Sequence, residues 1–316
     1  MSGGERSRPA GGGAFMSARK RVGFIGLGLM GSGMARNILA RGFPLTVLAH
    51  RNRQPVDELV SRGAQEASTA ADLARQSDVV IICVTGSLQV EDVLTRQGGL
   101  LEGVHPGLVV VDASTADPGF AERAEAMVRE RGGVYVDAPV NRTPKEAAEG
   151  RLNVLIGGDA AVVEQLRPVL EAYSETIHHL GPVGSGHKAK LIHNFIAQGN
   201  AVVLAEAFAT ASKVGLDLRA FADLCRLSGA HSKTFDRLVP FVLEGDDSNQ
   251  KFTLRNVVKD MRAYAHLAEM ASVTAFAAQS IYQTYVLATA LGHGDKYVAH
   301  LFDVLGEVNG TRVRAD

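Results

Sequence analysis

In the first part of the chain, up to about residue 180, apolar runs of strand length alternate with stretches of helical spacing. Most of these runs are continuously apolar, which is typical of strands buried on both faces of a parallel sheet. Beyond residue 184 the apolar residues recur only at helical spacing, and no strand is expected there. The pattern predicts an α/β domain with a mostly parallel, doubly wound sheet, followed by an all-α domain.

The expected strands are the runs at 22–25, 45–49, 78–84, 108–112, 133–140, 152–156 and 176–180. A helix is expected directly after the first strand and another around 90–94. In the second part, helices are expected at 217–227, at 235–243 and, as two or more helices, across 254–289.

One long helix, at about 187–213, is expected to join the two parts. Between 191 and 212 the only charged residue is Glu206, and no proline interrupts the run. Ser185 is a candidate N-cap, and Gly215 suits the C-terminal end. The run also contains polar residues that would be costly in lipid, so we predict a buried core helix and no membrane span.

This helix brings reactive side chains together. At about 100° per residue, Lys190, His193 and Asn194 fall on one face. A broad apolar band is formed by Ile192, Phe195, Ile196, Gly199, Val202 and Val203.

The N-terminus differs from the rest of the chain. It is rich in Gly, Ser and Arg, lacks the apolar stretch of a signal peptide and contains a second methionine, Met16. We expect a disordered tail at 1–20, the α/β domain at 21–184 and the all-α domain at 185–316.

The composition of the chain limits the classes of protein to which it can belong. With 316 residues, 46% of them hydrophobic, the chain can bury two cores. A net charge of −1 gives no reason to expect a nucleic-acid partner. Cys83 and Cys225 lie far apart within apolar patterns, so neither a disulfide framework nor a metal site is predicted. A cytoplasmic location fits these two cysteines.

A glycine-rich turn follows the first expected strand and precedes a helix. In this setting, the first glycine permits the tight turn, the second permits close approach of a pyrophosphate, and the third lets the helix pack on the strand. A phosphate would lie at the helix N-terminus. The motif predicts a Rossmann-type NAD(P)-binding domain, with the cofactor contacted by Gly26, Leu27, Gly28, Leu29, Met30 and Gly31.

The second expected strand ends in His50-Arg51-Asn52-Arg53. An NAD enzyme usually has an acid here for the ribose hydroxyls, and this chain has two arginines instead. Since a guanidinium fork suits a 2′-phosphate, we predict that NADP(H) is preferred and that NAD(H) remains possible. The alternative is a solvated basic turn.

In open parallel sheets, ligands lie beyond the carboxyl ends of the strands. This rule indicates Val84, Thr85, Gly86 and Ser87 after one strand, and Ser114 and Thr115 after the next. The alternative is that these residues are turn residues or helix caps.

Two further positions are ambiguous from the residues alone. Arg142 stands just before Pro144, at an expected helix start, where an arginine is electrostatically unhelpful unless it meets an anion. The alternative for Arg142 is a surface arginine beside a solvated loop. Lys259 and Asp260 lie within the expected helices, and these two residues taken alone indicate a surface ion pair.

Five motifs together resemble the β-hydroxyacid dehydrogenase family, which includes 3-hydroxyisobutyrate dehydrogenases and tartronate semialdehyde (2-hydroxy-3-oxopropionate) reductases and is related to 6-phosphogluconate dehydrogenase. They occur in the family's order and cover nearly everything from Arg21 onward. They are Gly-Phe-Ile-Gly-Leu-Gly-Leu-Met-Gly at 23–31, Asp-Ala-Ser-Thr-Ala-Asp-Pro at 112–118, Asp-Ala-Pro-Val at 137–140, Gly-Ser-Gly-His-Lys-Ala-Lys at 184–190 with Asn194, and Lys259-Asp260.

The resemblance implies a Rossmann domain, a long interdomain helix and an all-α domain that also forms the oligomer contact, in a homodimer or homotetramer. It implies that Lys190 is the catalytic lysine and that Asn194 orients the substrate. It also implies that Ser114 and Thr115 flank the nicotinamide or substrate and that Lys259 closes over the cofactor. Asn141, Arg142 and Thr143 would contact the substrate, with Arg142 and Thr143 binding its acid group.

The chain departs from the family at two places. His193 stands where the family usually has the first asparagine of Lys-x-x-Asn-Asn. Asn141-Arg142-Thr143 replaces Ser-Gly-Gly, which offers a hydroxyl and backbone N–H groups to the substrate carboxylate. Because a similar Gly-Arg-Thr occurs in 3-sulfolactaldehyde reductases, where the arginine meets a sulfonate, the resemblance leaves open an anion larger than a carboxylate.

The implied reaction interconverts a small 3-hydroxy acid and its aldehyde acid, with Lys190 as general acid in reduction and general base in oxidation. A lysine with an ordinary pKa of about 10.4 is a poor base at pH 7, so burial and nearby cations would have to lower that pKa. An imine reductase shares the layout but generally lacks this lysine. A non-catalytic dinucleotide-binding protein is the other alternative.

Overall fold

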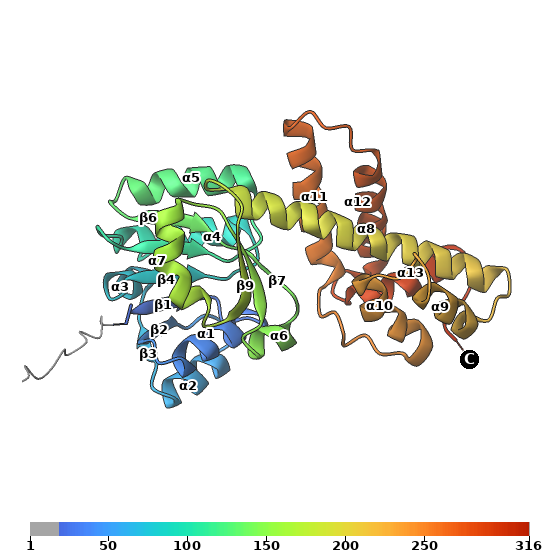
Figure 1. Cartoon of the computed structure of the whole chain (residues 1–316), viewed down its shortest axis with the longest axis horizontal. Helices are drawn as coiled ribbons and strands as arrows, with labels where there is room; N and C mark the ends of the chain where they lie inside the picture. The colour runs from blue at the N-terminus through green and yellow to red at the C-terminus, as the bar shows by residue number, and fades with distance from the viewer. Residues whose placement is uncertain (1–18, 316) are drawn as a thin grey trace, which may run out of the picture.

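A computed structural model describes residues 19–315 as a sheet-containing domain and a helical domain, joined by one long helix (Figure 1). This architecture agrees with the predicted fold class. Residues 1–18 of the expected tail at 1–20 lie outside the described residues.

Within the described residues, six parallel strands form the main sheet in the order β3-β2-β1-β4-β5-β6. Their bounds are β1 Val22–Ile25, β2 Leu45–Leu48, β3 Gln65–Ala67, β4 Val79–Ile82, β5 Val109–Asp112 and β6 Val134–Asp137. The sequence predicted every strand except β3, whose first two residues are polar and exposed. The order reverses beside β1, which places the glycine turn after β1 at the switch point where open sheets bind ligands.

Successive residues of the central strands pack on opposite faces of this sheet, which produces two separate cores. α1, α2 and α7 cover one face, and α3, α4 and α5 cover the other. The helical elements of this domain are α1 Gly31–Ala40, α2 Gln54–Ser61, α3 Ala70–Arg75, α4 Ser87–Thr95, η1 Leu100–Glu102, α5 Pro118–Arg129, α6 Pro144–Ala148 and α7 Ala160–Leu170.

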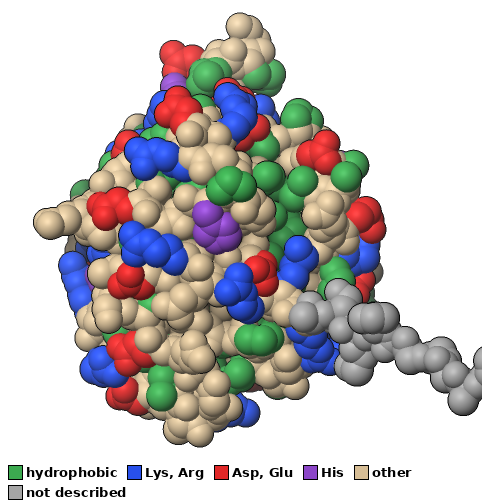
Figure 2. All heavy atoms as spheres, turned by 90° about the vertical axis from the view of Figure 1, so that its left-hand side faces the viewer, with side chains coloured by type: hydrophobic (Ala, Val, Ile, Leu, Met, Phe, Trp, Pro, Cys, Tyr) green, Lys and Arg blue, Asp and Glu red, His purple; other side chains and the backbone are tan. Residues whose placement is uncertain are grey.

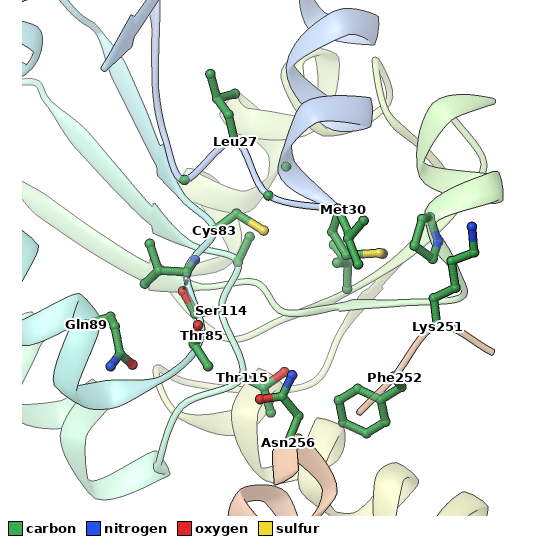
Figure 3. Close-up of a pocket in the computed structure, with 18 of the residues that line it drawn as sticks. Leu27, Met30, Cys83, Thr85, Gln89, Ser114, Thr115, Lys251, Phe252 and Asn256 are labelled. Atoms are coloured by element: carbon green, nitrogen blue, oxygen red, sulfur yellow. Dashed lines mark hydrogen bonds between the residues drawn. The ribbon is translucent and has the colours of Figure 1, made fainter. Parts of the chain in front are cut away.

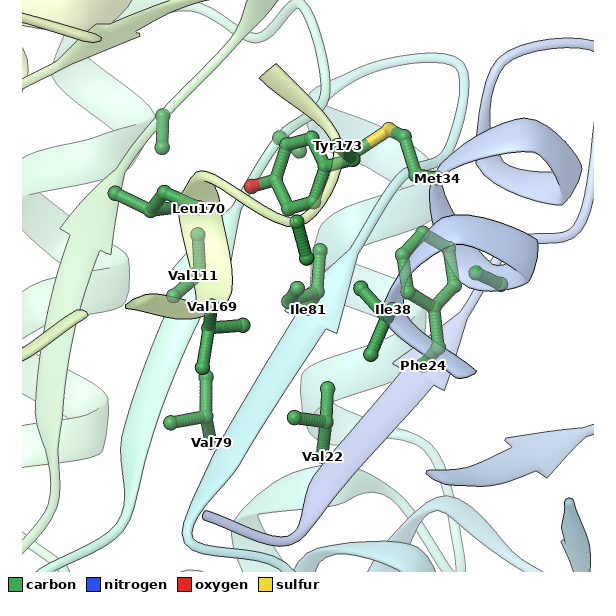
Figure 4. Packing of buried hydrophobic residues seen from close by; sticks show 14 of the residues in the cluster. Val22, Phe24, Met34, Ile38, Val79, Ile81, Val111, Val169, Leu170 and Tyr173 are labelled. Carbon is green, nitrogen blue, oxygen red and sulfur yellow. The ribbon is translucent and has the colours of Figure 1, made fainter. Parts of the chain in front are cut away.

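The first core is tightly filled. Phe24 of β1, Ile81 of β4, and Met34 and Ile38 of α1 pack together with Tyr173, which follows α7, and all five are fully buried (Figure 4). Burying an aliphatic or aromatic side chain of this size contributes about 1.5–3 kcal/mol. This packing holds α1, and with it the glycine turn, against the sheet.

The last three strands form a separate mixed sheet. β7 Val140–Asn141 pairs antiparallel with β8 Leu152–Ile156, and β8 pairs in parallel with β9 Ser174–His179. The expected strand at 133–140 is therefore divided: β6 ends at Asp137 and β7 begins at Val140. This break turns Asn141 and Arg142 out of the main sheet toward the domain junction.

The joining helix α8 spans Ser185–Lys213. The predicted cap is wrong: Ser185 is the first helical residue, and Gly184, with φ +90°, is the N-cap. The buried carboxylate of Asp137, at the end of β6, accepts hydrogen bonds from the N–H groups of Gly184 and His187, each 2.7 Å. Gly215 follows the end of the helix with φ +78°, as expected.

The C-terminal helices surround α8 and share a third core, in which Phe208 of α8 is fully buried. Among the described residues this domain has no strand, only a single bridge between Thr253 and Tyr297. Its other elements are α9 Leu218–Arg226, α10 Lys233–Glu244, α11 Leu254–Met270, α12 Phe276–Ala288, η2 Thr289–His293, η3 Val298–His300 and α13 Leu301–Val308.

The prediction that α8 is buried throughout is wrong along one edge. Ile192, Ile196 and Val203 are 47%, 59% and 64% exposed. They recur at helical spacing, so one apolar stripe of α8 faces away from the core of this chain.

No helix in the described part of the chain is long and apolar enough to cross a membrane. On the face at the sheet-domain end, acidic and basic side chains are interspersed (Figure 2).

Candidate active site

A cleft of about 660 Å³ lies between the two domains. Its walls come from the glycine turn, the carboxyl ends of β2, β4 and β5, the segment after β7, and helices α8, α10 and α11. Figure 3 shows the strand ends on one side and Phe252 and Asn256 of the helical domain on the other. The cleft thus lies where the open-sheet rule places a ligand.

The glycine turn has the geometry of a dinucleotide site. Gly26 has φ +101°, and a Cβ there would lie 2.2 Å from the carbonyl oxygen of Cys83. A Cβ on Gly28 would meet nothing within 4 Å, so the backbone faces open space. No side chain caps the N-terminus of α1, the end at which a helix can bind a phosphate. These features fit a bound NAD(P).

The two arginines after β2 differ in their surroundings. Arg51 lines the cleft with His50 and Asn52, and no hydrogen bond or ion pair holds its side chain among the described residues. Arg53 is absent from the lining, because its guanidinium binds Asp57 at 3.0 Å and Glu66 at 2.9 Å. Of these two arginines, Arg51 is therefore the one that lines the cleft.

The ends of β4 and β5 are tied together. The Ser114 hydroxyl, 2% exposed, accepts a hydrogen bond of 3.0 Å from the N–H of Val84. Ser114 also donates its own N–H to Asp112 at 2.9 Å. Val84, Thr85, Ser114 and Thr115 all line the cleft, whereas Gly86 and Ser87 form the N-terminus of α4.

Lys190 projects from α8 into the cleft. Its Nζ donates to the carbonyl oxygen of Val140 at 2.9 Å and to Asn141 Oδ1 at 2.7 Å. Burial lowers the pKa of Lys190 to about 8; the positive charge of Lys259 acts in the same direction, and Asp260 opposes them. This is the shift that proton transfer near neutral pH requires.

Lys259 and Asp260 are not a surface ion pair. Asp260 is 1% exposed and accepts a hydrogen bond of 2.7 Å from the Asn194 amide. Lys259 Nζ lies 2.8 Å from Asp260 and donates to the carbonyl oxygen of Thr115 at 2.7 Å. The pair thereby links α11 to α8 and to the segment after β5.

The segment after β7 holds the residues predicted to bind the acid group. Arg142 has φ +87°, a conformation that favours glycine. Its guanidinium donates to the carbonyl oxygen of Arg151 at 2.6 Å and pairs with Glu175. The hydroxyl of Thr143 bonds Glu146 in a capping box. Both residues line the cleft, but their polar groups are already engaged.

Sequence reasoning missed several residues that line the cleft, most of them from the helical domain. No local motif marks these residues. The missed lining residues include Gln89, Thr234, Arg237, Gln250, Lys251, Phe252 and Asn256.

Two family models match almost the whole described chain. Residues 21–181 match the NAD binding domain of 6-phosphogluconate dehydrogenase. Residues 184–305 match the NAD-binding domain of NADP-dependent 3-hydroxyisobutyrate dehydrogenase. The break between the matches falls just before α8.

Individual proteins agree with these models. A probable 3-hydroxyisobutyrate dehydrogenase-like protein of Arabidopsis thaliana is 32% identical, over 93% of this chain and 96% of its own length. An NAD-dependent L-serine dehydrogenase of Pseudomonas aeruginosa is 39% identical, over 66% of this chain and 70% of its own. The crystal structure of a Salmonella typhimurium 3-hydroxyisobutyrate dehydrogenase superposes with a TM-score of 0.81, at 28% identity, over 90% of this chain and 99% of its own.

Proposed function

The chain belongs to the β-hydroxyacid dehydrogenase family of NAD(P)-dependent oxidoreductases, and we propose that it interconverts a small 3-hydroxy acid and its aldehyde acid, with NADP(H) as the preferred cofactor. The proposed substrates are of the 3-hydroxyisobutyrate or 2-hydroxy-3-oxopropionate type. The observation that carries the proposal is the buried Lys190 amine, which lies in the cleft with a pKa lowered to about 8.

A bound nicotinamide would supply or accept the hydride in this reaction. In reduction, Lys190 as an ammonium gives its Nζ proton to the oxygen that becomes the hydroxyl. In oxidation, Lys190 as a neutral amine takes the hydroxyl proton. Asn141 and the Val140 carbonyl hold Nζ in position, and Asp260 holds the amide of Asn194, which we propose orients the substrate.

The cofactor would lie along the glycine turn and the strand ends. We propose contacts from 26–31, from His50, Arg51 and Asn52, and from Val84, Thr85 and Thr115, with Lys259 closing from α11. Substrate contacts are proposed for Ser114, Asn141 and Asn194.

A screen of aldehyde acids and hydroxy acids with both nicotinamide cofactors tests the proposal. The panel contains 3-hydroxyisobutyrate, L-serine, tartronate semialdehyde and 3-sulfolactaldehyde, with a cyclic imine as a control. Turnover of one of the acids with NADP(H) is expected. Turnover of the imine alone would identify an imine reductase instead, and binding of NADPH without any turnover would indicate a non-catalytic binding protein.

The lowered pKa of Lys190 predicts opposite pH dependence in the two directions. The ammonium that reduction needs is present below pH 8 and is lost above it, so kcat for reduction should fall about tenfold per pH unit beyond pH 8. The amine that oxidation needs is lost below pH 8, so kcat for oxidation should rise up to pH 8 and then level. Steady-state rates from pH 6 to 10 check this; a flat profile in both directions would contradict it.

We also propose that the chain forms a homodimer or homotetramer through the exposed stripe of Ile192, Ile196 and Val203, since exposed apolar stripes commonly mark interfaces. Light scattering of the purified protein should show an oligomer, and Ile196→Asp should weaken it because a charge would then be buried in the contact. A monomeric wild-type protein would reject this proposal.

A cytoplasmic location is proposed as well. Cys83 and Cys225 are both free thiols, which is usual in a reducing compartment.

A further inference from the structure

We propose that Arg237 on α10, rather than Arg142, is the cation that receives the acid group of the substrate. This inference rests on the proposed function and adds to it a specificity-determining residue and a location for the anion. It places the acid group against α10 of the helical domain.

The segment after β7 is a poor anion site in this chain. The carboxylate of Glu146 accepts the N–H of Thr143 at 3.0 Å and bonds the Thr143 hydroxyl as well. Glu175 neutralises the guanidinium of Arg142. An incoming acid group would meet two carboxylates here, and the donors that should bind it already have partners.

Arg237 is directed into the cleft by the packing of α10. Phe235, Leu238 and Val239 are almost fully buried in the core of the helical domain, so they fix the rotation of the helix. Thr234 and Arg237, three residues apart, then share the face that lines the cleft. Arg237 therefore reaches the cleft from a rigid element and not from a loop.

The charge of Arg237 acts on the part of the cleft where the reaction is expected. Burial lowers the pKa of His193, and the positive charges of Lys190 and Arg237 lower it further. His193 is three residues after Lys190 on α8, so Arg237 and Lys190 face the same short stretch of that helix. A substrate whose carbonyl lies at Lys190 can thus extend its acid group toward Arg237.

Arg237 has no directly bonded partner in the described part of the chain, although its charge also acts on the Glu146 carboxylate. Among residues 19–315, no hydrogen bond or ion pair engages its half-buried guanidinium, whereas Arg142 pairs with Glu175 and Arg96 with Asp92. A free guanidinium in a partly desolvated cleft is suited to a carboxylate, a sulfonate or a phosphonate, because its planar fork can bond two oxygens at once. The inferred substrate class is therefore a short aldehyde with one such acid group.

Matched variants separate this role from the alternatives. Arg237→Ala is expected to lower kcat/KM for 3-oxopropanoate by about 10–30-fold, chiefly through KM, as for a lost hydrogen bond to a charged group. It should change kcat/KM for propanal, a neutral aldehyde of the same length, by less than about twofold. Arg237→Lys should restore part of the loss, since a point charge cannot reproduce the fork.

Arg142→Ala is the control and should change neither substrate's kcat/KM by more than about twofold. A larger loss in Arg142→Ala than in Arg237→Ala would overturn the inference. So would an equal loss for propanal and 3-oxopropanoate, or a weakened affinity for NADPH in Arg237→Ala. Sulfonate and phosphonate aldehydes in the same assay show which acid group is preferred.

A binding measurement keeps this inference separate from the proposed reaction. Titration of NADPH-loaded protein with malonate or methylphosphonate should show binding that Arg237→Ala weakens by about 10-fold. If the unmodified protein reduces no aldehyde but binds these anions through Arg237, the proposed reaction fails and the anion site stands. If it reduces acid aldehydes and Arg237→Ala leaves both kinetics and anion binding unchanged, only the anion site fails.

Discussion

Lys190→Ala is expected to lower kcat by about a hundredfold or more in both directions, because general acid–base catalysis typically contributes 10²–10⁴-fold. The affinity for NADPH should persist, since the glycine turn and Arg51 belong to the β1 and β2 ends of the sheet domain and not to α8. Removing a buried amine should not unfold the protein, because its loss also removes the cost of burying a charge. Steady-state rates, NADPH binding and thermal unfolding measure the three quantities.

Lys188→Ala is the matched control for this prediction. Lys188 lies two residues earlier on α8, is 43% exposed and has Glu122 as its ion-pair partner 3.6 Å away, outside the cleft. Its replacement should leave kcat within about twofold of normal. Near-normal turnover in Lys190→Ala would show that another group moves the proton.

Arg51→Asp is expected to weaken binding of NADPH by about 2 kcal/mol or more and to affect NADH much less. The change removes the guanidinium that we propose binds the 2′-phosphate and adds a carboxylate that would repel that phosphate. Because Arg51 is exposed, high salt should reduce the preference of the unmodified protein for NADPH. Fluorescence titration with both cofactors at low and high salt measures these effects.

Arg53→Ala provides the comparison. Since Asp57 and Glu66 already hold the Arg53 side chain outside the cleft, its loss should change the affinity for NADPH only slightly. Equal affinity of the unmodified protein for NADH and NADPH would refute the proposed preference.

The strands that are buried on both faces could be predicted from the sequence, because a short, continuously apolar run such as Val79–Ile82 is typical of a strand buried on both faces. The glycine turn could also be predicted, since the strand, the turn and the helix follow one another directly in the sequence. β3 was not predicted because an edge strand with exposed Gln65 and Glu66 carries no apolar signal.

Contacts between residues far apart in the sequence could not be predicted from local sequence patterns. Asp137 lies 47 residues before Gly184, so nothing near the helix start indicated that a carboxylate from β6 would cap α8. In the same way, Glu66 of the unpredicted β3 withdraws Arg53 from the cofactor site. A sequence pattern supplies candidate side chains, but tertiary partners decide which of them remain free.

The two candidates for the acid-binding group, Arg142 and Arg237, illustrate this limit. Arg142 was predicted to bind the acid group because it precedes a helix start. Its positive φ and its ion pair with Glu175 arise in the small sheet that contains β7, β8 and β9, and the local sequence does not reveal them. Arg237 lies in an ordinary amphipathic helix, and only the packing of α10 against α8 brings it to the cleft.

Single-turnover transfer of deuterium tests the central claim most directly. NADPH carrying deuterium at both C4 positions of the nicotinamide is mixed with the protein and an aldehyde acid that the screen identifies, and the product is analysed by mass spectrometry. The account predicts a hydroxy acid with one deuterium on the former carbonyl carbon, formed rapidly by the unmodified protein and at least about a hundredfold more slowly by Lys190→Ala. Equal rates in the two proteins, or an undeuterated product, would contradict it.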